Sequence, residues 1–307
     1  MQITEHKSLK ELTTFGIGGP ARYYALCERE NDIREALDFC KGAHIPYVVL
    51  SGGSNVLIAD SGFDGCVIHI QSQGSVQKGN TIQIEAGVLL LDSIRRSHEY
   101  NLGGWEKLSG IPGSIGGAVR GNVGAFGIEI KEFCTGVTAL NSETLETRTF
   151  TPDECEFSYR NSYFKEHPEW IVLSATFSLQ GIQKNLSEAA TLETISEREK
   201  RHLQNVPCAG SYFMNPVAPQ WVQDLFKAEK KAEPREGRVP AGWLIEKAEM
   251  RGFSIGGAGS SEMHANYLIN KGGATADDVR KVAAKIQDAV RAKFLVSLLE
   301  EPSLIGF

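Results

Sequence analysis

Glycines gather in the segment "SGIPGSIGGAVRGNVGAFG", residues 109–127, where seven of nineteen positions carry no side chain. Six of these glycines form two runs with a spacing of three: Gly110, Gly113 and Gly116, then Gly121, Gly124 and Gly127. Glycine permits positive φ, so consecutive backbone N–H groups can converge on an anion. The same residues could instead serve only tight turns and close packing, and the segment alone leaves both interpretations open.

Another glycine stretch, "LSGGSNVLIAD", lies earlier in the chain and follows an apolar run that is typical of a buried strand. It is called the first stretch below, and residues 109–127 are called the second. Neither stretch has the GxxxxGK[ST] pattern of a P-loop or the GxGxxG pattern of a dinucleotide-binding turn. The glycine runs are too short for collagen, and a flexible linker is disfavoured because apolar side chains alternate with the glycines. We therefore expect residues 109–127 to form an ordered loop whose backbone lies close to another group. Two such stretches in one chain favour a diphosphate held by backbone N–H groups.

The composition narrows the class of protein. A chain of 307 residues is long enough for two or three domains. Its net charge of -6 argues against a broad surface for nucleic acid or anionic membrane but allows a local anion site. The six cysteines form no CxxC pair, which indicates reduced thiols. The sequence has no close set of His and Cys residues, so we expect no metal site. Without a secretory signal or a membrane-spanning apolar run, we expect a cytoplasmic protein.

Helices and strands must position the two glycine stretches. Apolar residues at helical spacing (Ile33, Ala36, Leu37 and Cys40) predict a helix within 31–44, and the run at 47–50 predicts a strand that enters the first stretch. Further apolar and alternating patterns predict strands over 66–70, 81–88 and 170–179, a short helix over 91–101, and a hairpin around residues 141–143. The middle third is therefore expected to be largely β.

The sequence of the last third of the chain predicts a separate α+β unit. Residues 185–205 are polar and helix-prone and lack a strong apolar stripe, so they predict a helix near a domain boundary. Residues 241–250 predict a short helix. A long helix should begin after Thr275, because Thr275 and Asp278 have the spacing of a capping box. Its continuous apolar face consists of Val279, Val282, Ala283, Ile286 and Val290.

Eight motifs carry a resemblance to a known family: "TTFGIGGPA", "LSGGSN", "LSGIPGSIGGAVRGNVGAFG", "FSYRNSYF", "AGSYFMNP", "AGWLIE", "SEMHANYLIN" and "EEPSLIG". Their order and spacing resemble those of the UDP-N-acetylenolpyruvoylglucosamine reductases, from about residue 10 to the carboxyl end. The chain is similar to the shorter type of that family, because no extra substrate-covering loop precedes "AGSYFMNP".

The resemblance implies an α+β protein with a vanillyl-alcohol-oxidase/PCMH-type FAD-binding fold of two subdomains and a C-terminal α+β substrate-binding domain. It implies residues 1–60, completed by about 296–307, for the first subdomain, 61–198 for the second, and 199–295 for the substrate-binding domain. FAD would be bound non-covalently. The residues implied to meet it are Gly52, Gly53, Ser54, Asn55, Ser109, Gly110, Pro112, Gly113, Ser114, Gly116, Gly117, Asn122 and Gly124.

The family's reaction passes a hydride from NADPH to the flavin and then to the enolpyruvyl group of a nucleotide sugar, which leaves an enolate that needs stabilisation and a proton. By resemblance, Arg160 stabilises the enolate, Ser211 donates the proton, and Glu301 polarises the intermediate or manages the proton. Tyr159, Asn215 and His264 match positions near the sugar nucleotide. The resemblance implies this small molecule as the partner, with no nucleic acid and no membrane, and a monomer is expected.

Structural roles for these side chains stay open on the sequence alone. Arg160 could form a salt bridge at a strand end, Ser211 could bond to its own turn, and Glu301 could be an exposed carboxylate beside Glu300. His264 could be a satisfied surface histidine. A basic cluster could attract a diphosphate or form a solvated face, and it consists of Lys227, Lys230, Lys231, Arg235 and Arg238.

Some positions depart from the family pattern. Met214 stands where the family usually has Lys, Val123 where Ala is usual, and Arg120 and Gly121 replace a bulkier pair before Asn122. Three functional hypotheses therefore remain: the reductase, another FAD-dependent oxidoreductase of the same fold, and a nucleotide-sugar-binding protein without catalysis.

Overall fold

The computed structural model describes residues 1–200 and 206–307 and divides the chain into two units. Unit 1 consists of Met1–Lys7, Ala21–Gly53 and Phe63–Lys200. Unit 2 consists of Ser8–Pro20, Ser54–Gly62 and the described part of the remainder, 206–307. The boundary passes through the first glycine stretch, with Gly53 in unit 1 and Ser54 in unit 2. The implied division into two subdomains and a substrate-binding domain stays a prediction.

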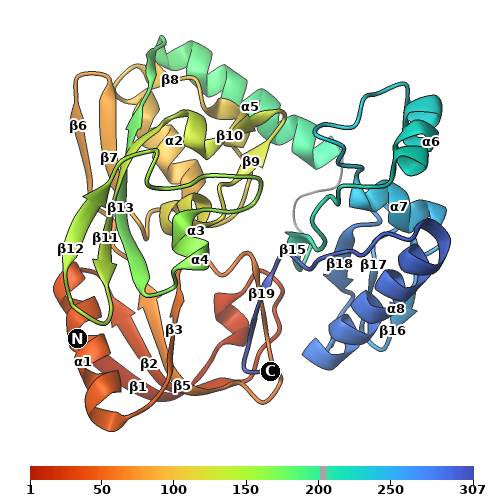
Figure 1. The fold of residues 1–307 in the computed structure, drawn as a ribbon. Coiled ribbons are helices and arrows are strands. Elements are labelled where there is room, and N and C mark those ends of the chain that lie inside the picture. Colours follow the sequence, from red (N-terminus) through yellow and green to blue (C-terminus); the bar gives the residue numbers. More distant parts are fainter. Residues whose placement is uncertain (201–205) are drawn as a thin grey trace. The chain divides into compact units, whose positions relative to one another are not determined.

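Two sheets form the frame of unit 1. Their strands are β1 (Gln2–Ser8), β2 (Pro20–Cys27), β3 (Tyr47–Leu50), β5 (Phe63–Ile70), β6 (Ser75–Lys78), β7 (Thr81–Glu85), β11 (Cys134–Asn141), β12 (Thr147–Phe150) and β13 (Trp170–Ser178). The first sheet has the order β1-β2-β5-β3, in which β2 and β3 run parallel to β5. The second has the order β12-β11-β13-β7-β6 with antiparallel neighbours (Figure 1). The strands predicted at 66–70, 81–88 and 170–179 are confirmed as parts of these sheets, the second ending at Glu85.

The hairpin predicted around residues 141–143 joins β11 to β12. The side-chain oxygen of Asn141 accepts the N–H groups of Glu143 and Thr144, both at 2.9 Å. Such local bonding by Asn is a common cause of a turn. Two further strand pairs complete unit 1: β8 (Leu102–Gly103) with β14 (Gln180–Gly181), and β9 (Gly124–Ala125) with β10 (Ile128–Glu129).

The helices of unit 1 are α1 (Glu30–Ala43), α2 (Leu90–His98), α3 (Ile115–Arg120), α4 (Tyr163–Glu166) and α5 (Lys184–Lys200), with short 3-10 turns η2 (Glu106–Leu108) and η3 (Ile130–Glu132). The predicted apolar face of α1 is buried. The buried face of α5 is polar: Ser187 donates to the Glu106 carboxylate, and Thr191 contacts Ser109. This polar contact explains why the sequence of α5 lacks an apolar stripe. Residues 201–205 of the predicted helix lie outside the described residues.

One expectation for the second glycine stretch is wrong. Residues 115–120, which the sequence indicated as part of an ordered loop, form the helix α3. The Ser114 side chain caps it by accepting the N–H of Gly117, and Ile115 and Val119 face the core. A capping serine and two buried apolar residues outweigh the poor helix propensity of paired glycines.

Unit 2 is built on an antiparallel sheet and four helical segments. The sheet has the order β15 (Cys208–Ser211), β18 (Tyr267–Asn270), β17 (Ala258–Ser260), β16 (Ser254–Ile255). The helical segments are η1 (Lys10–Leu12), α6 (Gln220–Lys230), α7 (Ala241–Lys247) and α8 (Ala276–Phe294). Helix α8 packs along this sheet with its predicted apolar face fully buried (Figure 1). A separate parallel pair joins β4 (Val56–Ile58) to β19 (Ser303–Ile305).

None of the helices within the described ranges combines the length and apolar character that crossing a membrane requires. The six cysteines are all buried and free, in agreement with the predicted reduced thiols.

The predicted capping box of α8 is confirmed. The Thr275 hydroxyl accepts the N–H of Asp278 at 3.0 Å, and the Asp278 carboxylate accepts the N–H of Thr275 at 3.2 Å. Asp60 adds a second cap, because its carboxylate accepts the N–H groups of Ala276 and Asp277 at 3.0 and 3.3 Å. The start of α8 is therefore stabilised both by its own capping box and by Asp60, which lies two residues after β4.

The substitution Thr275→Ala should lower the free energy of unfolding by about 1 kcal/mol, because it removes the N-cap acceptor of α8. Urea titration followed by circular dichroism measures this change, with Thr275→Ser as the control that keeps the hydroxyl. Equal midpoints for the Ala and Ser variants would show that the cap does not stabilise the fold.

Candidate active site

The two glycine stretches meet in unit 1. A Cβ atom on Gly52 would lie 2.6 Å from the Cα of Gly113 and 2.8 Å from the backbone nitrogen of Ser114. Only a residue without a side chain can occupy this position, because the obstructing atoms belong to backbone rather than to a movable side chain. The two stretches are therefore in direct backbone contact.

Several N–H groups of the second stretch are engaged within the protein. Ile115 and Gly116 donate to the carbonyl groups of Val88 and Ala86, both at 2.9 Å. Gly116 also packs closely, since a Cβ atom there would lie 2.9 Å from the Cβ of Ala86. For Gly116, close packing is thus a sufficient reason for glycine.

Other N–H groups remain for an anion. Among residues 1–200 and 206–307, the structure gives no protein acceptor to the backbone N–H of Gly53, Gly113 or Ser114. Gly53 and Gly113 have φ values of +58° and +118°, a region that favours glycine. Gly117 is exposed, and its nearest neighbour for a Cβ atom is the Ser114 hydroxyl at 3.8 Å. The N–H groups of Gly53, Gly113 and Ser114 form a set of backbone donors, and the absence of a side chain at Gly117 leaves space beside them, which suits a diphosphate.

Asn122 has a largely structural side chain. It is fully buried and donates both N–H groups, to the Glu129 carboxylate at 3.1 Å and to the Ser158 carbonyl at 2.8 Å. Its side-chain oxygen accepts the N–H of Lys131 at 3.3 Å. Asn122 therefore ties the end of the glycine stretch to the segment that carries Tyr159 and Arg160.

Arg160 reaches the same stretch. Its guanidinium donates to the carbonyl of Gly124 at 2.9 Å and lies 5.3 Å from the centre of the Tyr159 ring. Arg160 has a φ of +55°, and its carbonyl accepts the Lys165 ammonium at 2.9 Å. The structure thus brings the predicted residues Tyr159, Arg160, Asn122 and Gly124 together within unit 1.

Ser211, Glu301 and Asn55 are brought together within unit 2. The N–H of Glu301 donates to the carbonyl of Tyr212, the residue after Ser211, at 2.8 Å. The side chain of Asn55 donates to the Glu301 carbonyl at 3.4 Å, and the N–H of Ser303 donates to the Asn55 carbonyl at 3.0 Å. Three motifs that are far apart in the sequence therefore share one set of backbone contacts.

Glu300, the neighbour that competes with Glu301 in the sequence, already has a partner. The buried Tyr212 hydroxyl donates to the Glu300 carboxylate at 3.3 Å. Burial raises the pKa of Tyr212 well above its ordinary value, so the hydroxyl keeps its proton. This contact gives Glu300 a structural role beside the buried ring of Tyr212.

His264 is not a satisfied surface histidine. Its ring is half-buried beside Tyr267, with ring centres 4.7 Å apart, and its Nδ1 is buried without a protein partner among the described residues. Burial lowers the pKa of His264, so the ring is neutral near pH 7. A neutral ring with an unused nitrogen can bind a ligand group.

Asn215 and two lysines of the basic cluster have structural partners. The Asn215 side-chain oxygen accepts the N–H of Ala241 at 2.9 Å, at the start of α7. Lys227 pairs with Glu233, and Lys230 with Glu229 at 3.2 Å. These lysines are exposed or partly exposed and paired, as in an ordinary solvated face.

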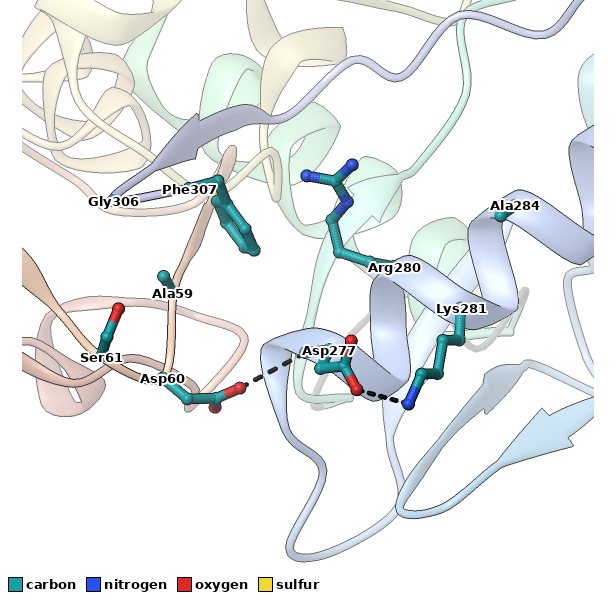
Figure 2. Close-up of a pocket in the computed structure, with 9 residues that line it drawn as sticks. All are labelled: Ala59, Asp60, Ser61, Asp277, Arg280, Lys281, Ala284, Gly306 and Phe307. Carbon is teal, nitrogen blue, oxygen red and sulfur yellow. Dashed lines mark hydrogen bonds and ion pairs between the residues drawn. The ribbon is translucent and has the colours of Figure 1, made fainter.

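A pocket of about 500 Å³ in unit 2 lies apart from these residues (Figure 2). Its lining consists of Ala59, Asp60, Ser61, Asp277, Arg280, Lys281, Ala284, Gly306 and Phe307. Lys281 pairs with Asp277 at 2.6 Å, and the Arg280 guanidinium lies 5.0 Å from the centre of the Phe307 ring. None of the predicted site residues lines this pocket. Within the described ranges, no cluster of three His, Cys, Asp or Glu side chains could hold a metal ion.

Comparison with known proteins decides the family. The chain matches the model of the UDP-N-acetylenolpyruvoylglucosamine reductase C-terminal domain over residues 201–305 and that of an FAD binding domain over residues 21–147. A UDP-N-acetylenolpyruvoylglucosamine reductase of Carboxydothermus hydrogenoformans is 38% identical over 311 residues, which cover 99% of this chain and 94% of the relative. The chain belongs to the UDP-N-acetylenolpyruvoylglucosamine reductase family.

Other relatives agree. The reductase of Solibacter usitatus is 31% identical over 306 residues, which cover 100% of this chain and 97% of the relative. The crystal structure of the reductase from Thermus caldophilus has a TM-score of 0.77 and 27% sequence identity, covering 99% of this chain and 98% of that one. The resemblance noted from eight motifs is confirmed, and so is the predicted fold class. This member of the reductase family is an FAD-binding oxidoreductase.

The residues of unit 1 fit FAD. The N–H groups of Gly53, Gly113 and Ser114 can hold its diphosphate, and the missing side chain of Gly117 leaves room beside them. Two contacts of this site were not predicted from the sequence, those of Glu129 with Asn122 and of Lys165 with Arg160. Glu129 lies in the two-residue strand β10 and Lys165 in the four-residue helix α4, which are too short for a periodic pattern to indicate their contacts.

The substitution Gly52→Ala should reduce FAD binding by at least about tenfold, because its Cβ must push the Gly113 and Ser114 backbone away, a change that costs about 1–3 kcal/mol. The visible flavin absorbance of the purified protein, relative to its protein absorbance, measures the bound FAD. Gly42→Ala in α1 is the control, since a Cβ atom there has no neighbour within 4 Å. Equal flavin content in both variants would contradict the close contact.

Proposed function

We propose that this protein reduces UDP-N-acetylglucosamine enolpyruvate to UDP-N-acetylmuramate, a peptidoglycan precursor, with NADPH as the hydride donor. The observation that carries the proposal is the backbone bond at 2.8 Å between Glu301 and Tyr212, which joins the motifs "AGSYFMNP" and "EEPSLIG". These motifs lie outside the flavin-binding stretches. They therefore support the reductase over another FAD-dependent oxidoreductase of the same fold.

Bound FAD supplies hydride transfer to the enolpyruvyl double bond. Negative charge then develops on the carbon beside the substrate carboxylate. The Arg160 guanidinium can stabilise this charge, since its paired N–H groups match the two oxygens of a carboxylate. The contact of Arg160 with the Gly124 carbonyl holds the guanidinium at the glycine stretch and supports this role.

Ser211 completes the reduction by donating its hydroxyl proton to the enolate carbon. A serine hydroxyl is a weak acid, so it can serve only a strongly basic carbanion and only when it is held in line. Glu301 assists the transfer of the proton or polarises the intermediate. Its backbone contact with Tyr212, the residue after Ser211, supports a role in the same step.

Tyr159, Asn215 and His264 are proposed to contact the sugar nucleotide. For His264, the support is its unpartnered Nδ1. For Asn215, the contact with Ala241 means that any substrate contact must use its remaining hydrogen-bonding capacity. The cytoplasmic location and the monomeric state remain predictions.

The substitution Ser211→Ala should leave flavin reduction by NADPH nearly unchanged but slow flavin reoxidation by the enolpyruvyl substrate by at least about 10²-fold, as expected for the loss of one transition-state donor. Anaerobic stopped flow separates the two half-reactions. Ser254→Ala is the control, because the Ser254 hydroxyl lies on an exposed position of β16 and donates to the Gly252 carbonyl at 3.0 Å.

Three other outcomes have distinct meanings. Wild-type reoxidation in Ser211→Ala would reject the proton-donor role. Equally fast reoxidation by unrelated acceptors would favour a different oxidoreductase. Binding of the nucleotide sugar without any turnover would favour a binding protein.

A further inference from the structure

We infer that Asn266 is a positioning residue for the proposed reductase reaction: it holds the backbone after Ser211 so that the Ser211 hydroxyl and Glu301 keep a fixed relation. This inference rests on the proposed function. Asn266 belongs to none of the predicted site residues, although it lies two residues after His264 in the motif "SEMHANYLIN".

Asn266 binds the segment after Ser211 through three hydrogen bonds. Its side-chain oxygen accepts the N–H of Phe213 at 2.9 Å, and its side-chain N–H donates to the carbonyl of the same residue at 2.8 Å. Its own carbonyl accepts the N–H of Tyr212 at 2.7 Å. Because one planar amide binds both the donor and the acceptor of Phe213, it fixes the rotation of that backbone as well as its position.

Glu301 binds the other side of the same segment. Its N–H donates to the Tyr212 carbonyl at 2.8 Å, and the N–H of Met214 donates to the Leu299 carbonyl at 2.9 Å. Tyr212 therefore gives its N–H to Asn266 and its carbonyl to Glu301. A displacement of the Asn266 amide must change the relation between Ser211 and Glu301.

Regular sheet pairing cannot do this alone. In the pairing of β15 with β18, Cys208 faces Ile269 and Ser211 faces Tyr267, so the register is interrupted between Cys208 and Ser211. Gly210, within the interruption, has a φ of +75°. Such a bulge redirects side chains and leaves the ladder locally broken. Asn266 supplies side-chain hydrogen bonds just beyond the break.

Asn266 is only 2% exposed, and it meets its partners without solvent. The rings of Tyr212 and Phe213 are buried as well, so apolar packing anchors this segment independently of the amide. The amide is therefore required for the geometry of the backbone more than for its burial. A variant that changes only the Asn266 amide can therefore keep the fold and still displace Ser211 relative to Glu301.

The test uses Asn266→Asp in the FAD-loaded enzyme. The change keeps the size of the side chain and the acceptor for Phe213 N–H but removes the donor to the Phe213 carbonyl. We expect unchanged flavin content, reduction by NADPH within about twofold of wild type, and reoxidation by the enolpyruvyl substrate slowed by about 10²-fold, as for a misplacement of about 1 Å. The substrate dissociation constant should stay within about threefold.

The matched control is Asn270→Asp, at the end of the strand β18, which begins directly after Asn266. The Asn270 side chain also bonds to backbone, donating to the Phe15 carbonyl at 3.1 Å and accepting the N–H of Gly272 at 2.9 Å. Asn270 lies on the side of the bulge away from Ser211, and within the described residues its side chain bonds to the backbone of Phe15, Gly272 and Ala274. Both half-reactions should stay at wild-type rates in this variant.

A double-mutant cycle decides whether Asn266 acts through Ser211. If it does, adding Asn266→Asp to Ser211→Ala should slow reoxidation no further, because the aligned group is already absent. Multiplying effects would overturn the inference, as would wild-type reoxidation in Asn266→Asp. If Ser211→Ala alone has no effect, the proposed function of Ser211 fails instead, and the single variant reports this separately.

A folding defect would also give an answer. Asn266→Gln keeps both hydrogen-bonding groups on a longer side chain and serves as the second variant. If the Asp and Gln variants both lose FAD or fail to accumulate while Asn270→Asp is normal, Asn266 is required for folding and the positioning role is rejected.

Discussion

The contact of Gly52 with Gly113 and Ser114 is the constraint on which the glycine-rich site of unit 1 depends. It brings two stretches of backbone closer than any side chain allows, and the N–H groups of Ile115 and Gly116 anchor the second stretch to the Val88 and Ala86 carbonyls. The N–H of Leu90 donates to the Gly113 carbonyl at 2.9 Å, so the second stretch cannot move away from the core. A diphosphate cradle built in this way needs no basic side chain, which agrees with the acidic net charge of the chain.

In both units, the proposed catalytic side chains lie on irregular backbone that side chains hold in place. Arg160 has a positive φ and is held by Lys165 and, through Ser158, by Asn122. Ser211 follows a bulge and is held by Asn266 through Tyr212 and Phe213. Irregular backbone of this kind costs about 1–3 kcal/mol per strained residue and persists only where surrounding contacts impose it. Buried Asn residues provide those contacts in each unit.

Much of the fold follows from local patterns. Helices α1 and α8 could be predicted because their apolar faces are long and periodic, and the start of α8 because its capping box is local. Helix α3 could not, because six residues with two glycines give no clear period and its position depends on bonds to Val88 and Ala86. The site residues could be named from their motifs, but their partners could not. The contact of Arg160 with Gly124 joins residues 36 positions apart, and no pattern of spacing indicates it.

The parallel pairing of β4 with β19 determines when this part of the protein can fold during its synthesis. Residues 303–305 pair with residues 56–58, so this pair closes a loop that contains most of the chain. Contacts between such distant segments form late, because the chain loses conformational entropy when the loop closes, before the new contacts stabilise it. On the ribosome, residues 56–58 emerge long before their partner exists. Glu301, two residues before β19, therefore reaches its place only in the final stage of folding.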